Sequence, residues 1–187
     1  AQELGLKVRG GFKGGTTPKE ASLVLKETSD TLPSILGEMN KQSNNFMAEQ
    51  ILRSIGAEMY GLPGTTEKGV RAINAYLSGL GVPESDFQLV NGSGLTRNGK
   101  VRPSAITRVL RAMWNDIEVG PEYLTSLSVG GRDGTLRSRF QEESMKGRVR
   151  GKTGTLTGVS CLAGYVRSTD GKTYAFAFLV NDLGDAP

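Results

Sequence analysis

The last third of the chain constrains the fold most, because it contains three β-rich stretches separated by short turns. The stretches cover residues 148–153, 159–167 and 173–181, and residues 155–158 and 169–172 separate them. This pattern predicts a three-stranded antiparallel meander. The third stretch is apolar on both sides, with Tyr174, Phe176, Phe178 and Val180 on one and Ala175, Ala177 and Leu179 on the other. Neither face suits water, so we expect the preceding helices to cover both faces of the sheet.

Helical patterns dominate the sequence before residue 130. The stretch Thr17-Pro18-Lys19-Glu20 has Thr at the N-cap, Pro at the first helical position and Glu at the third. This capping-box arrangement predicts a helix over residues 18–27. Further helices are expected over residues 32–41, 46–60, 67–80, 103–114 and 122–127. We expect an extended piece at residues 87–90, a turn at 91–94 and a loop at 130–134.

Composition restricts the chemistry that the chain can perform. Its 187 residues are 37% hydrophobic, which is enough for one sizeable core. Histidine is absent, which excludes Ser-His-Asp triads and His-ligated zinc from within the chain. The single cysteine, Cys161, excludes an internal disulfide and a Cys-rich metal site. Acid–base catalysis therefore falls to Lys, Asp, Glu, Tyr or Ser.

The stretch Gly151-Lys152-Thr153 raises the possibility of a phosphate-binding loop. That motif needs a glycine five residues before Gly151, but Lys146 stands there. It also needs a helix directly after the loop, whereas Lys152-Thr153-Gly154 lies near the end of the first predicted strand. We therefore reject a nucleotide site. A strand-borne Lys-Thr-Gly can instead present an ammonium and a hydroxyl to an anion, and its glycine lets a substrate backbone lie against the strand edge.

The net charge of +4 leaves nucleic-acid binding open as an alternative. Basic residues gather between positions 132 and 152, but Phe140 is the single aromatic residue among them. No helix-turn-helix or RNA-recognition pattern accompanies them, and solvated charge is the commoner cause of such a cluster. We favour the solvated surface.

Two motifs and the stretches around them resemble a known family. Ser43-Asn44-Asn45 and Lys152-Thr153-Gly154 resemble the second and third signature motifs of penicillin-binding proteins and serine β-lactamases. More narrowly, the chain resembles the C-terminal part of D-alanyl-D-alanine carboxypeptidases/endopeptidases of the DacB (penicillin-binding protein 4) type. Four stretches carry this resemblance: NKQSNNFMAEQILRSIG, NGSGLTRNGKVRPSAITRVLRAM, GGRDGTLRSRF and GRVRGKTGTLTGVSCLAGYV.

The resemblance implies a β-lactamase/transpeptidase-like α/β (α+β) fold, with helices covering an antiparallel sheet of which three strands lie in this chain. Residues 1–187 would be the C-terminal portion of a penicillin-binding domain, and residues 1–15 the tail of a preceding inserted domain. The implied activity is acyl transfer through an acyl-serine on the D-Ala-D-Ala end of peptidoglycan stem peptides, with β-lactams as inhibitors. It implies no cofactor, metal, nucleic acid or membrane span, and a periplasmic or extracytoplasmic location.

The resemblance also implies roles for single residues. Ser43 relays a proton to the leaving amine, and Asn45 holds the substrate amide. Lys152 supplies positive potential and binds Ser43. The substrate lies against Thr153, Gly154 and Thr155: Thr153 receives the terminal carboxylate, and the Thr155 N–H serves the oxyanion hole. Independently of the family, Ser43 and Asn45 are expected to form a break that caps two helices.

The family's nucleophile motif, Ser-x-x-Lys, does not occur in these residues. Threonine versions begin at Thr16 and Thr65, and we interpret both as helix starts. The resemblance therefore implies that the N-terminal part of the same protein supplies the nucleophile, two further strands and inserted domains. It also implies a closing helix outside these residues. This chain alone would then be inactive. The alternative is a non-catalytic module that binds cell-wall peptide or glycan through the same cleft.

Overall fold

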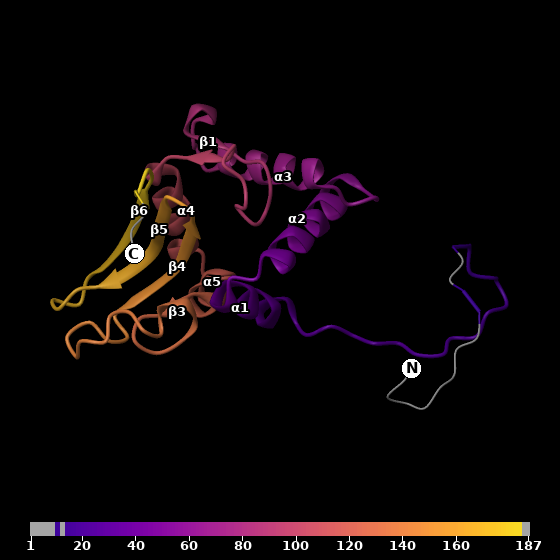
Figure 1. Cartoon of the computed structure of the whole chain (residues 1–187), viewed down its shortest axis with the longest axis horizontal. Helices are drawn as coiled ribbons and strands as arrows, with labels where there is room; N and C mark the ends of the chain where they lie inside the picture. Colours follow the sequence, from indigo (N-terminus) through magenta and orange to yellow (C-terminus); the bar gives the residue numbers. More distant parts are fainter. Residues whose placement is uncertain (1–9, 12–13, 185–187) are drawn as a thin grey trace.

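The computed structural model describes residues 10–11 and 14–184 (Figure 1). The helices are α1 (Leu32–Gln42), α2 (Asn45–Tyr60), α3 (Thr66–Gly79), α4 (Pro103–Asn115) and α5 (Gly120–Ser126), with 3₁₀ turns η1 (Glu84–Asp86) and η2 (Gly134–Leu136). The strands are β1 (Phe87–Gln88), β2 (Lys100–Val101), β3 (Ser128–Val129), β4 (Val149–Leu156), β5 (Val159–Arg167) and β6 (Thr173–Val180). The five helices expected after residue 30 are all present, within two residues of their predicted bounds.

The main sheet is antiparallel and has the order β3-β4-β5-β6. The predicted meander of β4, β5 and β6 is confirmed, but β4 continues to Leu156, so Lys152-Thr153-Gly154 lies within the strand rather than near its end. A fourth strand, β3, adds to the expected three and pairs with β4 only at Gly151 and Arg150. Two residues are too few to show a strand periodicity in the sequence.

Helices α4 and α5 cover one face of this sheet (Figure 1). On that face Tyr165 packs with Leu110 and Leu127, and the Tyr165 hydroxyl donates to the Leu110 carbonyl at 2.6 Å. This buried hydrogen bond ties the middle of β5 to α4.

The other face is covered only in part, and the expectation of helices on both faces is wrong. Near β4, the segment between η2 and β4 lays Phe140 and Met145 over Val149 and Leu162. Toward β6 the cover ends, and the outer side chains Tyr174, Phe178 and Val180 are 51%, 63% and 44% exposed. The apolar alternation of β6 is therefore real, but on one side of it Phe176 packs against the described core while Tyr174, Phe178 and Val180 stay exposed.

Helices α2 and α3 pack against each other and approach closely at two glycines. A Cβ on Gly69 would lie 2.2 Å from the Leu52 carbonyl oxygen, and a Cβ on Gly56 would lie 2.6 Å from the Gly69 nitrogen. Only glycine allows this backbone contact. Beyond it, Leu77, Val82, Phe87 and Ala105 form a core cluster that joins α3 to α4 through the short β1 strand.

The helix predicted over residues 18–27 is wrong. Residues 14–31 are exposed and contain one turn, in which the Ala21 N–H donates to the Pro18 carbonyl at 3.1 Å. Leu23, Val24 and Leu25 are 79% to 96% exposed. A short helix is marginal unless it buries an apolar face, and no described part of the chain covers this segment, so its capping signal is not sufficient. Most of residues 1–15 lie outside the described residues, and their assignment to a preceding domain stays a prediction.

Candidate active site

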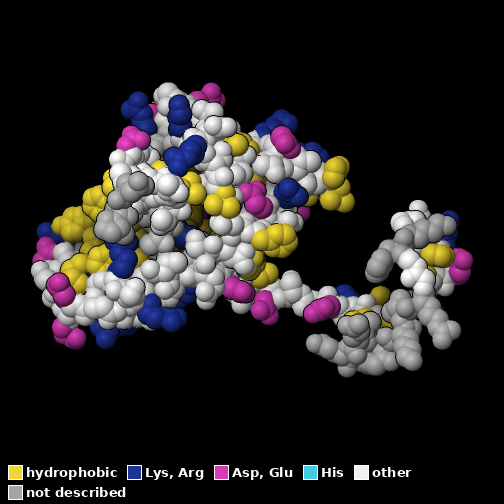
Figure 2. Space-filling view, viewed as in Figure 1, with side chains coloured by type: hydrophobic (Ala, Val, Ile, Leu, Met, Phe, Trp, Pro, Cys, Tyr) yellow, Lys and Arg dark blue, Asp and Glu magenta, His cyan; other side chains and the backbone are white. Residues whose placement is uncertain are grey.

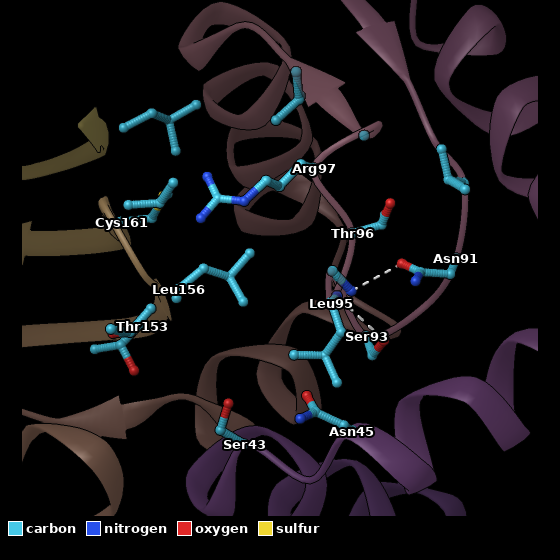
Figure 3. Close-up of a pocket in the computed structure, with 18 of the residues that line it drawn as sticks. Ser43, Asn45, Asn91, Ser93, Leu95, Thr96, Arg97, Thr153, Leu156 and Cys161 are labelled. Atoms are coloured by element: carbon cyan, nitrogen blue, oxygen red, sulfur yellow. Dashed lines mark hydrogen bonds between the residues drawn. The ribbon is translucent and has the colours of Figure 1, made fainter. Parts of the chain in front are cut away.

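Ser43 lies at the break between α1 and α2, where the chain changes direction. It is the C-cap of α1 and adopts the left-handed conformation, with φ 54° and ψ 48°. The predicted break is confirmed, but Asn44 rather than Asn45 caps α2, because the Asn44 side chain accepts the Met47 N–H at 3.1 Å. The break lets Ser43 and Asn45 both face the same groove, as Figure 3 shows. On a continuous helix, side chains two residues apart would diverge.

Lys152 extends from β4 toward this break. Its ammonium donates to Ser43 Oγ at 2.6 Å and to the Thr153 carbonyl at 2.7 Å. Burial lowers the pKa of Lys152 from its ordinary value of 10.5, because the charged form loses water around it. The two motifs predicted from the sequence thus meet through a direct hydrogen bond between a partly buried cation and a hydroxyl.

The groove between the break and β4 is large and open, with a volume of about 1220 Å³. Asn45, Thr153, Gly154 and Thr155 line it together with Ser43 and Lys152. A Cβ on Gly154 would meet only the Cβ of Cys161, at 3.5 Å. Packing within the chain therefore does not require glycine here, and its missing side chain leaves room for a ligand at the strand.

Residues 91–99 form the wall of the groove opposite β4 (Figure 3). The Glu49 carboxylate of α2 accepts the Ser93 hydroxyl at 2.6 Å and the Ser93 N–H at 2.9 Å. These bonds, led by the Ser93 hydroxyl, lower the pKa of Glu49. At the other end of the segment, Arg97 donates to the Thr157 carbonyl at 2.7 Å. The segment is thus tied both to α2 and to the turn after β4.

The loop between β3 and η2 holds the end of α1 next to the groove. The Asp133 carboxylate binds the Lys41 ammonium at 2.6 Å and accepts the Val129 N–H at 2.7 Å. Burial alone would raise the pKa of Asp133, but these hydrogen bonds and the positive charges of Lys41 and Arg150 together outweigh it and lower the pKa. Because Lys41 stands two residues before Ser43, this ion pair fixes the end of α1 that carries the serine.

Sequence reasoning did not single out Glu49, Arg97, Lys41 or Asp133. The sequence predicts a turn at residues 91–94 and a loop at 130–134, and both segments are irregular up to the start of η2 at Gly134, but such a signal does not identify the tertiary partner of the segment. The chemistry that the groove presents is an ammonium beside a hydroxyl, a second hydroxyl at Thr153, and an open strand edge. No group of three or more His, Cys, Asp or Glu side chains in the described part of the chain is placed to hold a metal ion.

The whole chain, residues 1–187, matches one protein family, the D-Ala-D-Ala carboxypeptidase 3 (S13) family. The chain belongs to the S13 family. A D-alanyl-D-alanine carboxypeptidase of Actinomadura sp. (strain R39) is 35% identical over 196 residues, which cover 98% of this chain and 35% of that protein.

Solved structures agree with membership of the S13 family. Penicillin-binding protein 4 (DacB) from Haemophilus influenzae superimposes with a TM-score of 0.82 at 28% identity, over 91% of this chain and 38% of that one. Its complex with a novel β-lactam gives a TM-score of 0.81 at 27% identity, over 92% and 40% of the two chains. An extended-spectrum β-lactamase, TLA-1, at 17% identity and a TM-score of 0.60 over 81% and 56%, shares the fold. The expected β-lactamase/transpeptidase-like fold is confirmed.

The chain spans 35% of the length of the Actinomadura carboxypeptidase and 38% of the Haemophilus influenzae penicillin-binding protein 4. In the described part of the chain, no helix combines the length and apolarity needed to cross a membrane.

Proposed function

We propose that the protein containing this chain is a serine D-Ala-D-Ala carboxypeptidase/endopeptidase that acts on peptidoglycan stem peptides outside the cytoplasm. One observation carries the proposal: Lys152 Nζ lies 2.6 Å from Ser43 Oγ, on the floor of a groove that an extended peptide can enter. The location rests on the substrate, since peptidoglycan stem peptides are found outside the cytoplasmic membrane.

In the proposed reaction a serine hydroxyl attacks the carbonyl carbon of the penultimate D-Ala. A C–O bond forms, the C–N bond to the terminal D-Ala breaks, and water later releases the acyl group from the serine. Ser43, held by the Lys152 ammonium, delivers the proton that the leaving amine requires. The Thr155 N–H binds the oxyanion, and Asn45 holds the substrate amide.

The substrate backbone is proposed to lie along the open edge of β4. Strand β3 pairs with β4 only at Arg150 and Gly151, so the edge from Lys152 onward faces the groove. An extended peptide can add to such an edge as an extra strand. This placement brings its terminal carboxylate to Thr153, with the Lys152 charge beside it. A β-lactam would enter the same groove and acylate the same serine.

The attacking serine is not supplied by a Ser-x-x-Lys motif of this chain, since its residues contain none. We propose that the N-terminal part of the same protein supplies it, which makes the isolated chain a half-site that positions substrate and moves a proton but forms no acyl-enzyme.

Mass spectrometry after incubation with penicillin tests the proposal in two arms. The intact protein should gain one covalent adduct on a serine outside this chain, and the isolated chain should gain none. An intact protein that gains no adduct and releases no D-Ala would contradict the enzymatic proposal and favour a non-catalytic cell-wall binding module. A stoichiometric adduct on the isolated chain would contradict the half-site.

A further inference from the structure

Three hydroxyl groups form a row that leads from the buried end of β3 to the groove. Ser128 Oγ, which is completely buried, accepts the Thr135 N–H at 3.2 Å and lies 3.4 Å from Thr135 Oγ1. In turn, Thr153 Oγ1 donates to Thr135 Oγ1 at 2.9 Å. Thr153 is the groove residue of this row, and Figure 3 shows it on β4 near Ser43. Thr135 therefore stands directly behind the hydroxyl that faces a bound ligand.

Thr135 is held in place from both sides. Before it, Gly134 has φ +53°, and a Cβ there would lie 2.2 Å from Ser128 Oγ. After it, Leu136 is fully buried in the cluster with Val149 and Leu162. A side chain fixed in this way cannot move aside when the groove fills, so its hydroxyl stays within reach of Thr153.

We propose that Thr135 is a positioning residue for carboxylate recognition, acting through the Thr153 hydroxyl; the inference rests on the proposed function. Without a ligand, the Thr153 proton is donated to Thr135 and does not point into the groove. A carboxylate competes for that proton, because a hydrogen bond to a charged acceptor is about twice as strong as a neutral one. When the Thr153 proton turns to the carboxylate, Thr135 turns its own proton to Thr153 Oγ1.

A hydroxyl side chain can perform this exchange, since it accepts in one state and donates in the other. The relay also polarises the Thr153 hydroxyl toward the anion, because hydrogen bonds in a chain strengthen one another. A valine at position 135 keeps the shape and loses both functions, whereas a serine keeps both.

The test compares the intact parent with Thr135→Val, Thr135→Ser and Thr153→Val on two N-acylated peptides, one ending in free D-Ala-D-Ala and one in its methyl amide. Thr135→Val should lower kcat/KM for the acid about tenfold, mainly through KM, and leave the amide unchanged. Thr135→Ser should stay near the parent. In the double variant, Thr135→Val should lower kcat/KM little further than Thr153→Val alone, because Thr135 acts through the Thr153 hydroxyl. Thr125→Val removes an exposed threonine hydroxyl that binds the Glu122 carbonyl, and serves as the matched control.

Equal losses on acid and amide, or additive losses with Thr153→Val, would show a purely structural role and overturn the inference. So would a Thr135→Val enzyme that matches the parent on the acid. A parent that cleaves neither peptide contradicts the proposed function itself, which separates the two failures.

Discussion

At the scale of single residues, Ser43 joins two demands that conflict. Its φ of 54° is a conformation that glycine adopts without cost and that other residues adopt at about 1 kcal/mol. Helix ends with this geometry usually take glycine for that reason. A glycine here, however, would leave the Lys152 ammonium without the hydroxyl that it binds at 2.6 Å. The position therefore gives up some stability to keep a functional side chain.

Ser43→Gly and Ser43→Ala separate these demands, because both remove the hydroxyl and only glycine relieves the backbone. We expect Ser43→Gly to be more stable than Ser43→Ala by about 1 kcal/mol in urea unfolding. Both should slow penicillin acylation of the intact protein to a similar extent. Equal stability of the two variants would contradict the strain, and parent-like acylation in either would remove Ser43 from the site.

Lys152 is expected to matter more for acylation than for folding. Lys152→Ala should slow penicillin acylation of the intact protein by about a hundredfold to a thousandfold, the usual loss when a preorganised transition-state contact is removed. Lys152→Arg should recover part of the rate, since a planar guanidinium does not reproduce the geometry of a compact ammonium. The measurement is the second-order acylation rate, with a thermal melt of each variant. Normal acylation by both variants would show that Lys152 lies outside the site.

The lowered pKa of Lys152 also predicts how stability changes with pH. Between its folded pKa and the ordinary value of 10.5, the unfolded chain binds more protons than the folded one, so the free energy of unfolding rises with pH in that window. Below the window, the folded state carries the full cost of a buried ammonium. The change in Tm caused by Lys152→Met should therefore be most favourable near neutral pH, and any gain should shrink as pH approaches 10.5. Melts of parent, Lys152→Met and the exposed-site control Lys100→Met check this, and a gain that grows with pH would contradict it.

At the scale of elements, the α2–α3 pair depends on backbone contact rather than on side-chain interlocking. Gly56 and Gly69 let the two helices approach, and Leu52 is buried against them at 2% exposure. This pair carries Glu49 and thereby the Ser93 end of the groove wall. If the two helices moved apart, Glu49 would shift and the groove wall at Ser93 would lose its support.

Gly69→Ala tests this contact, with Gly79→Ala as its control in the same helix. A Cβ at Gly69 meets the Leu52 carbonyl at 2.2 Å, whereas nothing lies within 4 Å of a Cβ at Gly79. We expect Gly69→Ala to lower the free energy of unfolding by about 3 kcal/mol and Gly79→Ala to leave it unchanged or slightly higher. Urea unfolding measures both. Similar values for the two variants would show that the helices separate without cost.

Elements with a long periodic pattern were predictable from the sequence, and elements fixed by a partner were not. The spacing of apolar residues in helix α2 and in strands β4 to β6 follows the helical and strand periods, so it predicts these elements directly. Residues 18–27 carry a good capping signal, yet they form no helix, because no described part of the chain offers an apolar surface against them. In the site, Ser43 and Lys152 followed from motifs, whereas Thr135 became visible only once β3 and η2 placed it behind Thr153. Nothing in the order of residues specifies that contact.

At the scale of the whole molecule, three of the basic residues between positions 132 and 152 make hydrogen bonds within the chain. Arg148 donates to the Ser168 carbonyl, Arg150 to the Leu124 carbonyl, and Lys152 lies in the groove. On the face shown in Figure 2, acidic side chains are interspersed with the basic ones. A nucleic-acid backbone requires a continuous positive track, and we favour contacts within the chain and solvation as the role of these charges.

Nucleic-acid binding should accordingly be weak and strongly dependent on salt. We expect duplex DNA or RNA to bind the chain without sequence preference, and to lose affinity steeply as the salt concentration rises toward physiological values. Fluorescence anisotropy across a salt series measures this. Submicromolar, sequence-selective binding at physiological salt would reverse the ranking of the functions proposed above.

The exposed side of β6 has a consequence for the chain in solution. In the described part of the chain β6 pairs with β5 alone, so its outer edge presents free N–H and C=O groups beside Tyr174, Phe178 and Val180. A free, apolar edge accepts any extended strand that reaches it, whether from the same polypeptide or from another molecule. A strand of the same protein would bind this edge in preference to other molecules at any protein concentration, because it is covalently linked. Without one, neighbouring molecules compete instead, and crowding drives them toward edge-to-edge stacking and precipitation.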